Sequence, residues 1–260
     1  MYNIADAFGI HDQSTLAWMT AGYSLSVGTF ILISGRMGDI LGYKKMFIAG
    51  FIWFSLWSLI AGFSVYSNSV LFIFARVLQG IGPAFTVTNG LALLGATYPP
   101  GKKKNLIFSI FGAMSPVGAV LGCIHAALWS LLWFPWAFWE FAIVLAAIAV
   151  ASVFVIPDPP KKAQPARQWR KFLVDQLDLV GGALGVTALV LFNFAWNQAT
   201  SVGWGKAYII FTLVLGTLLA PVFFWYESKV AKSPLIPFKV FTADILFVVA
   251  AEACGWACFG

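Results

Sequence analysis

An arginine within an apolar stretch and an aspartate between two apolar stretches are the best candidates for chemistry in this sequence. Arg76 lies in ARVLQGIGPAF, Ala75 to Phe85, where Gln79 and Gly80 follow it. A cation inside a membrane-spanning segment needs water, a partner group or a route to the membrane surface, so such residues often mark solute or ion pathways. The alternative is that the Arg76 side chain extends to the outer headgroups.

Asp39 lies in the compact charged stretch GRMGDILGYKK, Gly35 to Lys45, between two apolar runs. Near the end of a helix an acid is disfavoured by the helix dipole unless an arginine or the N-terminus of another helix compensates it. A charge that needs a partner from elsewhere can act as a latch, and Asp39 is a candidate for that role. Gly35 and Gly38 permit close approach of a neighbouring helix, and Gly42 suits a tight turn with positive φ.

Three other polar residues in apolar stretches are considered for a role in function. Asn89 is predicted to line a polar cavity. Glu140 follows Pro135 among several tryptophans, which is typical of an acid at the membrane interface, and a proton-carrying role is the alternative. His125 is expected to pack near the outer end of its helix.

No catalytic constellation accompanies these residues. The sequence has no nucleophile elbow, phosphate-binding loop or zinc-binding spacing, so we expect neither enzyme activity nor a metal or other cofactor. The three cysteines are an odd number and all lie in apolar segments, so we expect small hydrophobic residues rather than a disulfide set.

The composition places the chain in a lipid bilayer. Hydrophobic residues make up 60% of the 260, charged residues make up 10%, and the mean hydropathy is +0.86. Soluble domains carry about a quarter charged residues, so this chain lacks the polar surface to cover a globular body in water. The bases behind the net charge of +6 lie in short loops, where we expect them to face anionic lipid headgroups rather than nucleic acid.

Apolar runs long enough to cross a bilayer as helices follow one another along the chain. A hydrocarbon core of about 30 Å needs about twenty helical residues, and these runs are too continuous for barrel strands. The sequence therefore predicts an all-α membrane protein with seven full transmembrane helices and the start of an eighth near residue 241. The seven helices are predicted at 16–35, 46–65, 69–98, 105–129, 135–156, 178–199 and 206–227.

The basic residues fall on every second connection. The segments 36–45, 99–104, 157–177 and 228–240 hold three, three, five and three of the 16 lysines and arginines. Cytoplasmic loops are rich in these residues, so the four segments are predicted to be cytoplasmic. The acidic chain before residue 16 is then outside without a cleavable signal peptide, which leads us to expect a further helix before residue 1. The chain also stops in mid-span, so we expect about half of a longer protein.

The stretch GRMGDILGYKK resembles the signature G-x-L-A-D-R-x-G-R-K between the second and third helices of the major facilitator superfamily. The matching positions are Gly35, Asp39, Gly42 and Lys44. Ile40 and Tyr43 replace two bases of the pattern. The resemblance implies that this loop is a cytoplasmic gate holding two helical bundles together, a role carried over to Asp39. A generic cytoplasmic hairpin is the alternative.

The stretch ARVLQGIGPAF resembles the fourth-helix signature R-x-x-Q-G-x-G-x-A of the same superfamily. The matching positions are Arg76, Gln79, Gly80, Gly82 and Ala84. The resemblance implies that Arg76 faces the solute cavity and couples proton movement to substrate movement. Gln79, Gly80 and Asn89 are grouped with it as cavity residues. Its expected partner is an acid on the helix expected before residue 1.

A third stretch, FGAMSPVGAVLG, occupies the place of the fifth-helix antiporter motif of drug/proton exchangers. A degenerate version of that motif is formed by Gly112, Pro116, Gly118 and Gly122. Gly118 and Gly122 are four residues apart and Pro116 bends the helix, so plain helix packing would need the same residues.

The remaining segments resemble fungal drug/proton antiporters with fourteen helices. Leu177 to Trp204 is similar to part of their extra helix pair, and SPLIPFKVF, Ser233 to Phe241, to the lead-in to their C-terminal bundle. The predicted organisation is an N-terminal bundle lacking its first helix (1–156), a cytoplasmic loop (157–177), an extra linker pair (178–227) and the truncated start of a C-terminal bundle (228–260).

The resemblance implies transport of a small solute by alternating access, with proton-coupled export of small organic or drug-like compounds as the expected form. The expected partners are a small-molecule or ion substrate, protons and lipid of the plasma or vacuolar membrane. Uptake of a small ion such as ammonium is the alternative within transport. A seven-helix receptor and a truncated product that transports nothing are alternatives of other classes.

Overall fold

The chain folds into long helices joined by short connections. The computed structural model describes residues 2–10, 12–157, 177–231, 233–235 and 242–259. Its helices are α1 (Tyr2–Phe8), α2 (Gln13–Leu41), α3 (Tyr43–Phe63), α4 (Ser69–Gln79), α5 (Ile81–Thr97), α6 (Lys102–Leu132), α7 (Pro135–Val155), α9 (Leu179–Val202), α10 (Ala207–Lys229) and α11 (Ala243–Phe259). The predicted all-α fold is confirmed.

The described residues contain seven spans that are long and apolar enough to cross a membrane. Five are single helices, α3 and the 3-10 helix Ser64–Tyr66 together form the span Tyr43–Tyr66, and α4 and α5 together form the span Ser69–Thr97. Even the shortest, α7, has 21 residues and a length of about 32 Å, enough for the hydrocarbon core. The seven predicted spans are therefore confirmed. The predicted eighth helix corresponds to α11, which is 17 residues long.

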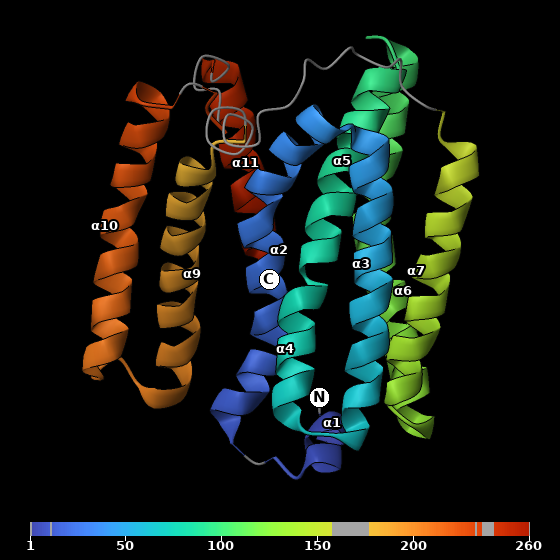
Figure 1. Cartoon of the computed structure of the whole chain (residues 1–260), viewed down its shortest axis with the longest axis vertical. Coiled ribbons are helices and arrows are strands. Elements are labelled where there is room, and N and C mark those ends of the chain that lie inside the picture. Colours follow the sequence, from blue (N-terminus) through green and yellow to red (C-terminus); the bar gives the residue numbers. More distant parts are fainter. Residues whose placement is uncertain (1, 11, 158–176, 232, 236–241, 260) are drawn as a thin grey trace.

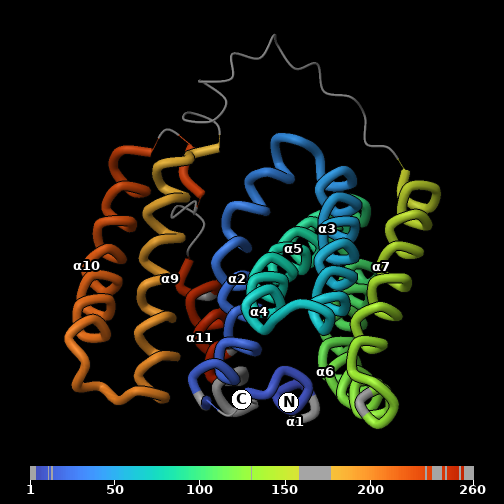
Figure 2. The backbone as a smooth tube through the Cα atoms, turned by 60° about the horizontal axis from the view of Figure 1, so that its bottom comes forward, coloured from blue at the N-terminus to red at the C-terminus, as the bar shows by residue number. Residues whose placement is uncertain are grey.

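The helices form a central group with a helix pair at one side. In the centre, α3 packs against α5 and α7, and α2 packs against α4 and α5. The pair α9–α10 lies beside α2, on the side away from α6 and α7 (Figures 1 and 2). Within α6, the 18-residue apolar window has no buried residue, so this helix is the least covered of the seven spans.

The basic connections gather at one end of the molecule. The α2–α3 and α5–α6 turns and the last residues of α7 and α10 all lie at the top of Figure 1. We call the opposite end the outer end; it holds α1 and the α3–α4, α6–α7 and α9–α10 connections. The arrangement is the one that alternating basic loops require.

A short helix that the sequence analysis did not predict covers part of the outer end. The Phe8 ring of α1 lies 5.7 Å from Phe72 of α4 and 6.0 Å from Phe134, just before α7. Phe72 and Phe134 belong to a buried cluster with Met19, so α1 is held by apolar contacts. Asp12 then caps α2: its carboxylate accepts hydrogen bonds from Ser14 Oγ and from the backbone and side chain of Thr15, which lower the pKa of Asp12.

The predicted linker pair 178–227 corresponds to α9 and α10, which pack against each other. Asp178 caps α9 by accepting a hydrogen bond from the Gly181 backbone N–H at 3.1 Å. Most of the predicted loop 157–177 lies outside the described residues. The assignment of the two bundles and the linker pair stays a prediction.

Candidate functional site

The signature residues of the α2–α3 connection lie mostly within a helix. The sequence analysis ended the first predicted helix at residue 35, whereas α2 continues to Leu41 and α3 begins at Tyr43. The prediction ended the helix too early because it took the charged residues as the boundary. A helix continues past the hydrocarbon until its backbone is interrupted. The interruption is Gly42, with φ 100° and ψ 129°, which confirms the predicted positive φ.

Asp39 interacts with side chains from its own hairpin. The Tyr43 hydroxyl donates to Asp39 Oδ1 at 2.6 Å, and Arg36 Nη1 lies 3.8 Å from Oδ2. The side chain of Asp39 is 48% exposed. The sequence analysis expected an arginine or the N-terminus of another helix beside Asp39; Arg36 and Tyr43, the first residue of α3, lie there. Tyr43, which replaces a base of the family pattern, supplies a neutral donor. The Lys44 side chain of the same signature is buried.

Gly35 and Gly38 let α2 approach α5 closely. A methyl group built on Gly38 would overlap Asn89 Oδ1, and one built on Gly35 would lie 3.2 Å from Thr88 Cγ2. Asn89 is fully buried, and its Nδ2 donates to the Phe85 carbonyl at 2.8 Å within α5. The predicted close approach at these glycines is confirmed. Asn89 itself lies in this helix contact rather than beside Arg76.

Replacing Gly38 with alanine is therefore expected to destabilise the chain. The methyl group has to displace the buried Asn89 amide, and such overpacking costs about 1–3 kcal/mol. Gly28→Ala is the matched control, because Gly28 is also in α2 and a methyl group there meets no atom within 4 Å. The measurement is the midpoint of thermal unfolding in detergent. A Gly38→Ala midpoint equal to that of Gly28→Ala would contradict the packing described above.

Arg76 is held inside the helix bundle by groups from several helices. It lies seven residues after the start of α4, about 10 Å along the helix from the outer end. Its Nη1 donates to Gln79 Oε1, and its Nε donates to the Met19 carbonyl of α2 at 3.4 Å. The guanidinium carbon lies 4.5 Å from the ring centroid of Tyr23, also in α2, and 5.8 Å from that of Phe138 in α7. These contacts direct the side chain inward rather than to the outer headgroups.

Gln79 extends the network to α3. Its Nε2 donates to Ser58 Oγ at 2.6 Å, and that hydroxyl donates to the Phe54 carbonyl at 2.7 Å. Gln79 and Ser58 are both buried, and the hydrogen bonds described above give their side chains the partners that buried polar groups require. The Arg76 network therefore joins α2, α3 and α4.

The positive charge of Arg76 has no carboxylate partner within the described part of the chain. Ion pairs in that part of the chain join Arg36 with Asp39 and His125 with Glu140. Arg76 is instead neutralised partly by a carbonyl, an amide and aromatic faces, which compensate a cation only weakly. An additional anionic group near Arg76 would therefore be stabilised.

Gly80 and Gly82, which follow the Arg76 helix, bring the chain close to α2 and α3. A methyl group on Gly80 would overlap the Tyr23 carbonyl oxygen, and one on Gly82 would lie 2.5 Å from Phe54 Cβ. The sequence predicted one continuous helix over 69–98, but the structure separates α4 from α5 at Gly80. Pro83 explains the interruption, because it has no N–H to donate to the Gln79 carbonyl.

The four residues of the fifth-helix motif lie apart from this network. They are on α6 and exposed, and among the described residues a methyl group built on any of the three glycines meets no atom within 4 Å. The members are Gly112, Pro116, Gly118 and Gly122. The location of these residues therefore favours neither a packing role nor an antiport role for the motif.

The structure thus divides the predicted cavity residues into two places. Arg76, Gln79 and Gly80 lie together, whereas Asn89 is nine residues beyond Gly80 and contacts Gly38. Sequence reasoning missed Tyr23 and Ser58 as members of the network. A signal was present, because both are polar residues in the outer halves of the helices on either side of the α2–α3 turn.

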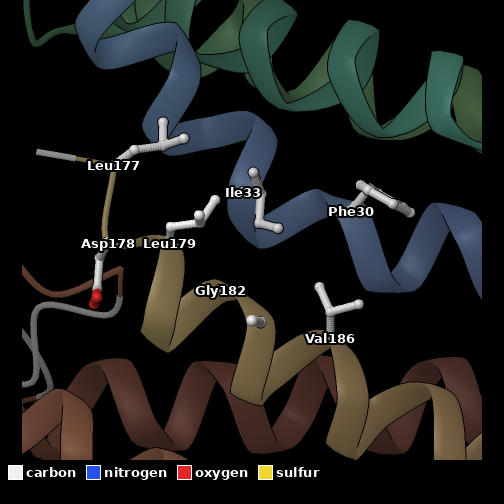
Figure 3. A pocket seen from close by; sticks show the side chains of 8 residues that line it. Phe30, Ile33, Leu177, Asp178, Leu179, Gly182 and Val186 are labelled. Atoms are coloured by element: carbon white, nitrogen blue, oxygen red, sulfur yellow. The ribbon is translucent and has the colours of Figure 1, made fainter. Parts of the chain in front are cut away.

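One cavity lies between α2 and α9 (Figure 3). Its volume is about 170 Å³, below the roughly 300 Å³ that a small-molecule pocket needs. Its lining is apolar and includes Phe30 and Ile33 of α2 and Gly182 and Val186 of α9, while the Asp178 carboxylate points away from these side chains (Figure 3). This cavity is therefore a packing gap rather than a solute site.

Comparison with known proteins adds independent information. The family model described as Major Facilitator Superfamily matches residues 1–251. The chain is 46% identical to a low affinity ammonium transporter of Saccharomyces cerevisiae over 261 residues, covering 100% of this chain and 50% of that protein. It is 43% identical to efflux pump terG of Aspergillus terreus, covering 99% of this chain and 48% of the pump.

A third relative is the multidrug transporter mdr3 of Aspergillus fumigatus. It is 42% identical over 223 residues, which cover 85% of this chain and 41% of mdr3. The chain thus spans about half the length, or less, of these relatives.

Proposed function

Because the chain belongs to the major facilitator superfamily, a family of membrane transporters rather than enzymes, we propose that it forms part of a carrier for a small solute. It is a multi-pass integral membrane protein with seven spans among the described residues. The carrier works by alternating access, in which helical bundles rock around a central site. The inferred form is proton-coupled export of small organic compounds.

The Arg76 network is the observation that carries this proposal. A proton-coupled carrier needs an internal group whose charge compensation changes during the cycle, and Arg76 is an internal charge with neutral partners. An acid that comes near Arg76 is stabilised as a carboxylate, and its protonation weakens that attraction. Proton binding and solute movement are linked if both change the position of this acid.

Uptake of ammonium is the second candidate. It is favoured by the relative whose name is low affinity ammonium transporter, which matches the chain over its whole length at 46% identity. The names of terG and mdr3, at 43% and 42% identity, favour export of larger compounds. The two candidates differ in direction and in substrate.

A substrate panel distinguishes the two candidates. The full-length carrier of which this chain forms part is expressed in a yeast strain that lacks its own drug exporters and ammonium carriers, and accumulation of labelled methylammonium and of several lipophilic cations is followed at external pH 5 and 7. Export predicts lower accumulation of one or more lipophilic cations at pH 5 than at pH 7, relative to the empty vector. Uptake predicts higher methylammonium accumulation instead. Unchanged accumulation of every compound would contradict a carrier role for the chain.

Asp39 is proposed to hold the gate at the basic end of the bundle. Asp39→Ala removes the acceptor for Tyr43 and the partner of Arg36, and we expect transport to fall by about tenfold or more while membrane insertion is retained. Tyr43→Phe removes only the hydroxyl and should have a smaller effect of the same sign. Transport rates and surface expression are measured together. A normal transport rate in the Asp39→Ala variant would contradict the proposed role of Asp39 in the gate.

A further inference from the structure

A cluster of polar and aromatic side chains joins α6 to α7 at the outer end. His125 Nε2 lies 2.6 Å from Glu140 Oε2, and Trp129 Nε1 donates to the same oxygen at 2.9 Å. Trp136 stacks on Trp129, with ring centroids 6.0 Å apart and planes inclined by 25°. The cluster consists of His125, Trp129, Trp136 and Glu140, and it adds an interaction with Glu140 to the packing expected of His125.

Glu140 keeps an acceptor for a further ligand. Among the described residues, both hydrogen bonds that this carboxylate accepts end on Oε2, and Oε1 accepts none. No lysine or arginine of the described chain forms an ion pair with Glu140, whose side chain is 32% exposed. The acid lies five residues after the start of α7, about 8 Å along the helix. A carboxylate at that depth attracts a cation, since the membrane solvates charge poorly.

The neighbouring rings favour a particular class of cation. Indole faces attract cations through the ring quadrupole, and aromatic groups combined with a carboxylate are the usual recognition chemistry for alkylammonium groups. Trp136 is 44% exposed, so much of its ring remains available beside the carboxylate. A hydrated metal ion gains little from such rings, and the described residues hold no group of three or more metal-ligating side chains.

We propose that Glu140, with the rings of Trp129 and Trp136, binds an alkylammonium cation at the outer end of α6 and α7. The cation contacts Glu140 Oε1 and an indole face, while His125 and the Trp129 N–H hold the carboxylate through Oε2. The cation is either a free solute or the choline headgroup of an outer-leaflet lipid, which present the same chemistry. The site is separate from the Arg76 network and does not depend on the transport activity proposed above.

A direct binding measurement tests the site. The purified 260-residue chain in a maltoside detergent, which has no ammonium group, is titrated calorimetrically with tetramethylammonium chloride. The neutral isostere tert-butanol is the matched control ligand. We expect saturable binding of tetramethylammonium and none of tert-butanol. Absence of saturable binding, or equal binding of the two compounds, would overturn the proposal.

Three variants assign the binding to the named groups. Glu140→Gln should weaken it by at least tenfold and Trp136→Leu by at least threefold, whereas Asp6→Asn, a change of another acid at the outer end, should leave it unchanged. Thermal unfolding of each variant in the same detergent shows whether it is folded. If Glu140→Gln destabilises the protein, Trp136→Leu and the tert-butanol control still test the site. A folded Glu140→Gln variant that binds tetramethylammonium as tightly as the original protein would refute the proposed site.

His125 separates a binding site from a mere tether between two helices. His125→Ala should change tetramethylammonium affinity less than threefold, because the ligand is placed on Oε1 and the imidazole on Oε2. If His125→Ala lowered affinity as much as Glu140→Gln, the pair would be a tether and the site would be rejected. Repeating the titration in phosphatidylcholine nanodiscs identifies the source: weaker apparent binding there indicates that choline headgroups occupy the same site, and unchanged binding indicates a site for free cations.

Discussion

Replacing Arg76 with methionine is expected to reduce the pH-dependent part of solute transport by at least about 100-fold. Methionine occupies a similar volume but cannot donate to Gln79 or the Met19 carbonyl, and it carries no charge to attract an acid. A factor of 100 corresponds to about 2.7 kcal/mol, a reasonable value for one charge acting in a poorly solvated site. Folding should not suffer equally, because removing an incompletely compensated internal charge is often neutral or stabilising.

The measurement compares transport at external pH 5 and pH 7 with thermal unfolding of the same variants. Arg76→Lys is the companion variant: it keeps the charge but loses the planar group that lies over Tyr23 and bonds two partners. We expect it to retain part of the pH dependence. An unchanged pH profile in Arg76→Met would count against proton coupling through this residue.

The second large effect is expected from Gly80→Ala. The added methyl group overlaps the carbonyl oxygen of Tyr23, which belongs to the α2 backbone and cannot rotate away as a side chain would. Helix α4 must then move from α2, so we expect a loss of about 2–3 kcal/mol in the free energy of unfolding. The Arg76 contacts with Met19 and Tyr23 depend on the same approach, so transport should fall as well.

Gly95→Ala is the matched control for Gly80→Ala. Gly95 lies in α5, and a methyl group there would meet Phe108 at 3.9 Å, an ordinary contact. Replacing a glycine within a helix with alanine should then stabilise the helix slightly. Chemical denaturation of both variants in detergent measures the difference. Equal stability of the two would show that α2 and α4 are not packed as closely as described.

The number and order of the spans follow from the sequence because hydropathy alone decides them. Each run of about twenty apolar residues must form a helix in lipid, where backbone groups have no water to bond. The errors in the predicted spans lie at the ends of the helices. Helix α2 extends to Leu41 because Arg36 and Asp39 do not interrupt a backbone, and α1 is too short to stand out from its surroundings.

Within the candidate site, local features were predictable and contacts between helices were not. Gly42 could be predicted to have positive φ from its position in a tight turn, and Arg76 stood out as a charge in an apolar run. That Tyr23 and Ser58 join Arg76 depends on how α2 and α3 rotate against α4, which spacing along one helix does not determine. For the same reason Asn89 was grouped with Arg76 although it faces Gly38.

The central claim is that Arg76 links proton movement to solute movement. Its most direct test is proton flux across proteoliposomes that contain the full-length carrier of which this chain forms part and a trapped pH-sensitive dye, with no other ion gradient. The account predicts that adding a transported solute from the panel changes the internal pH with the original protein, and that Arg76→Met abolishes this change while remaining folded. A solute-driven pH change of the same size in Arg76→Met would contradict the account.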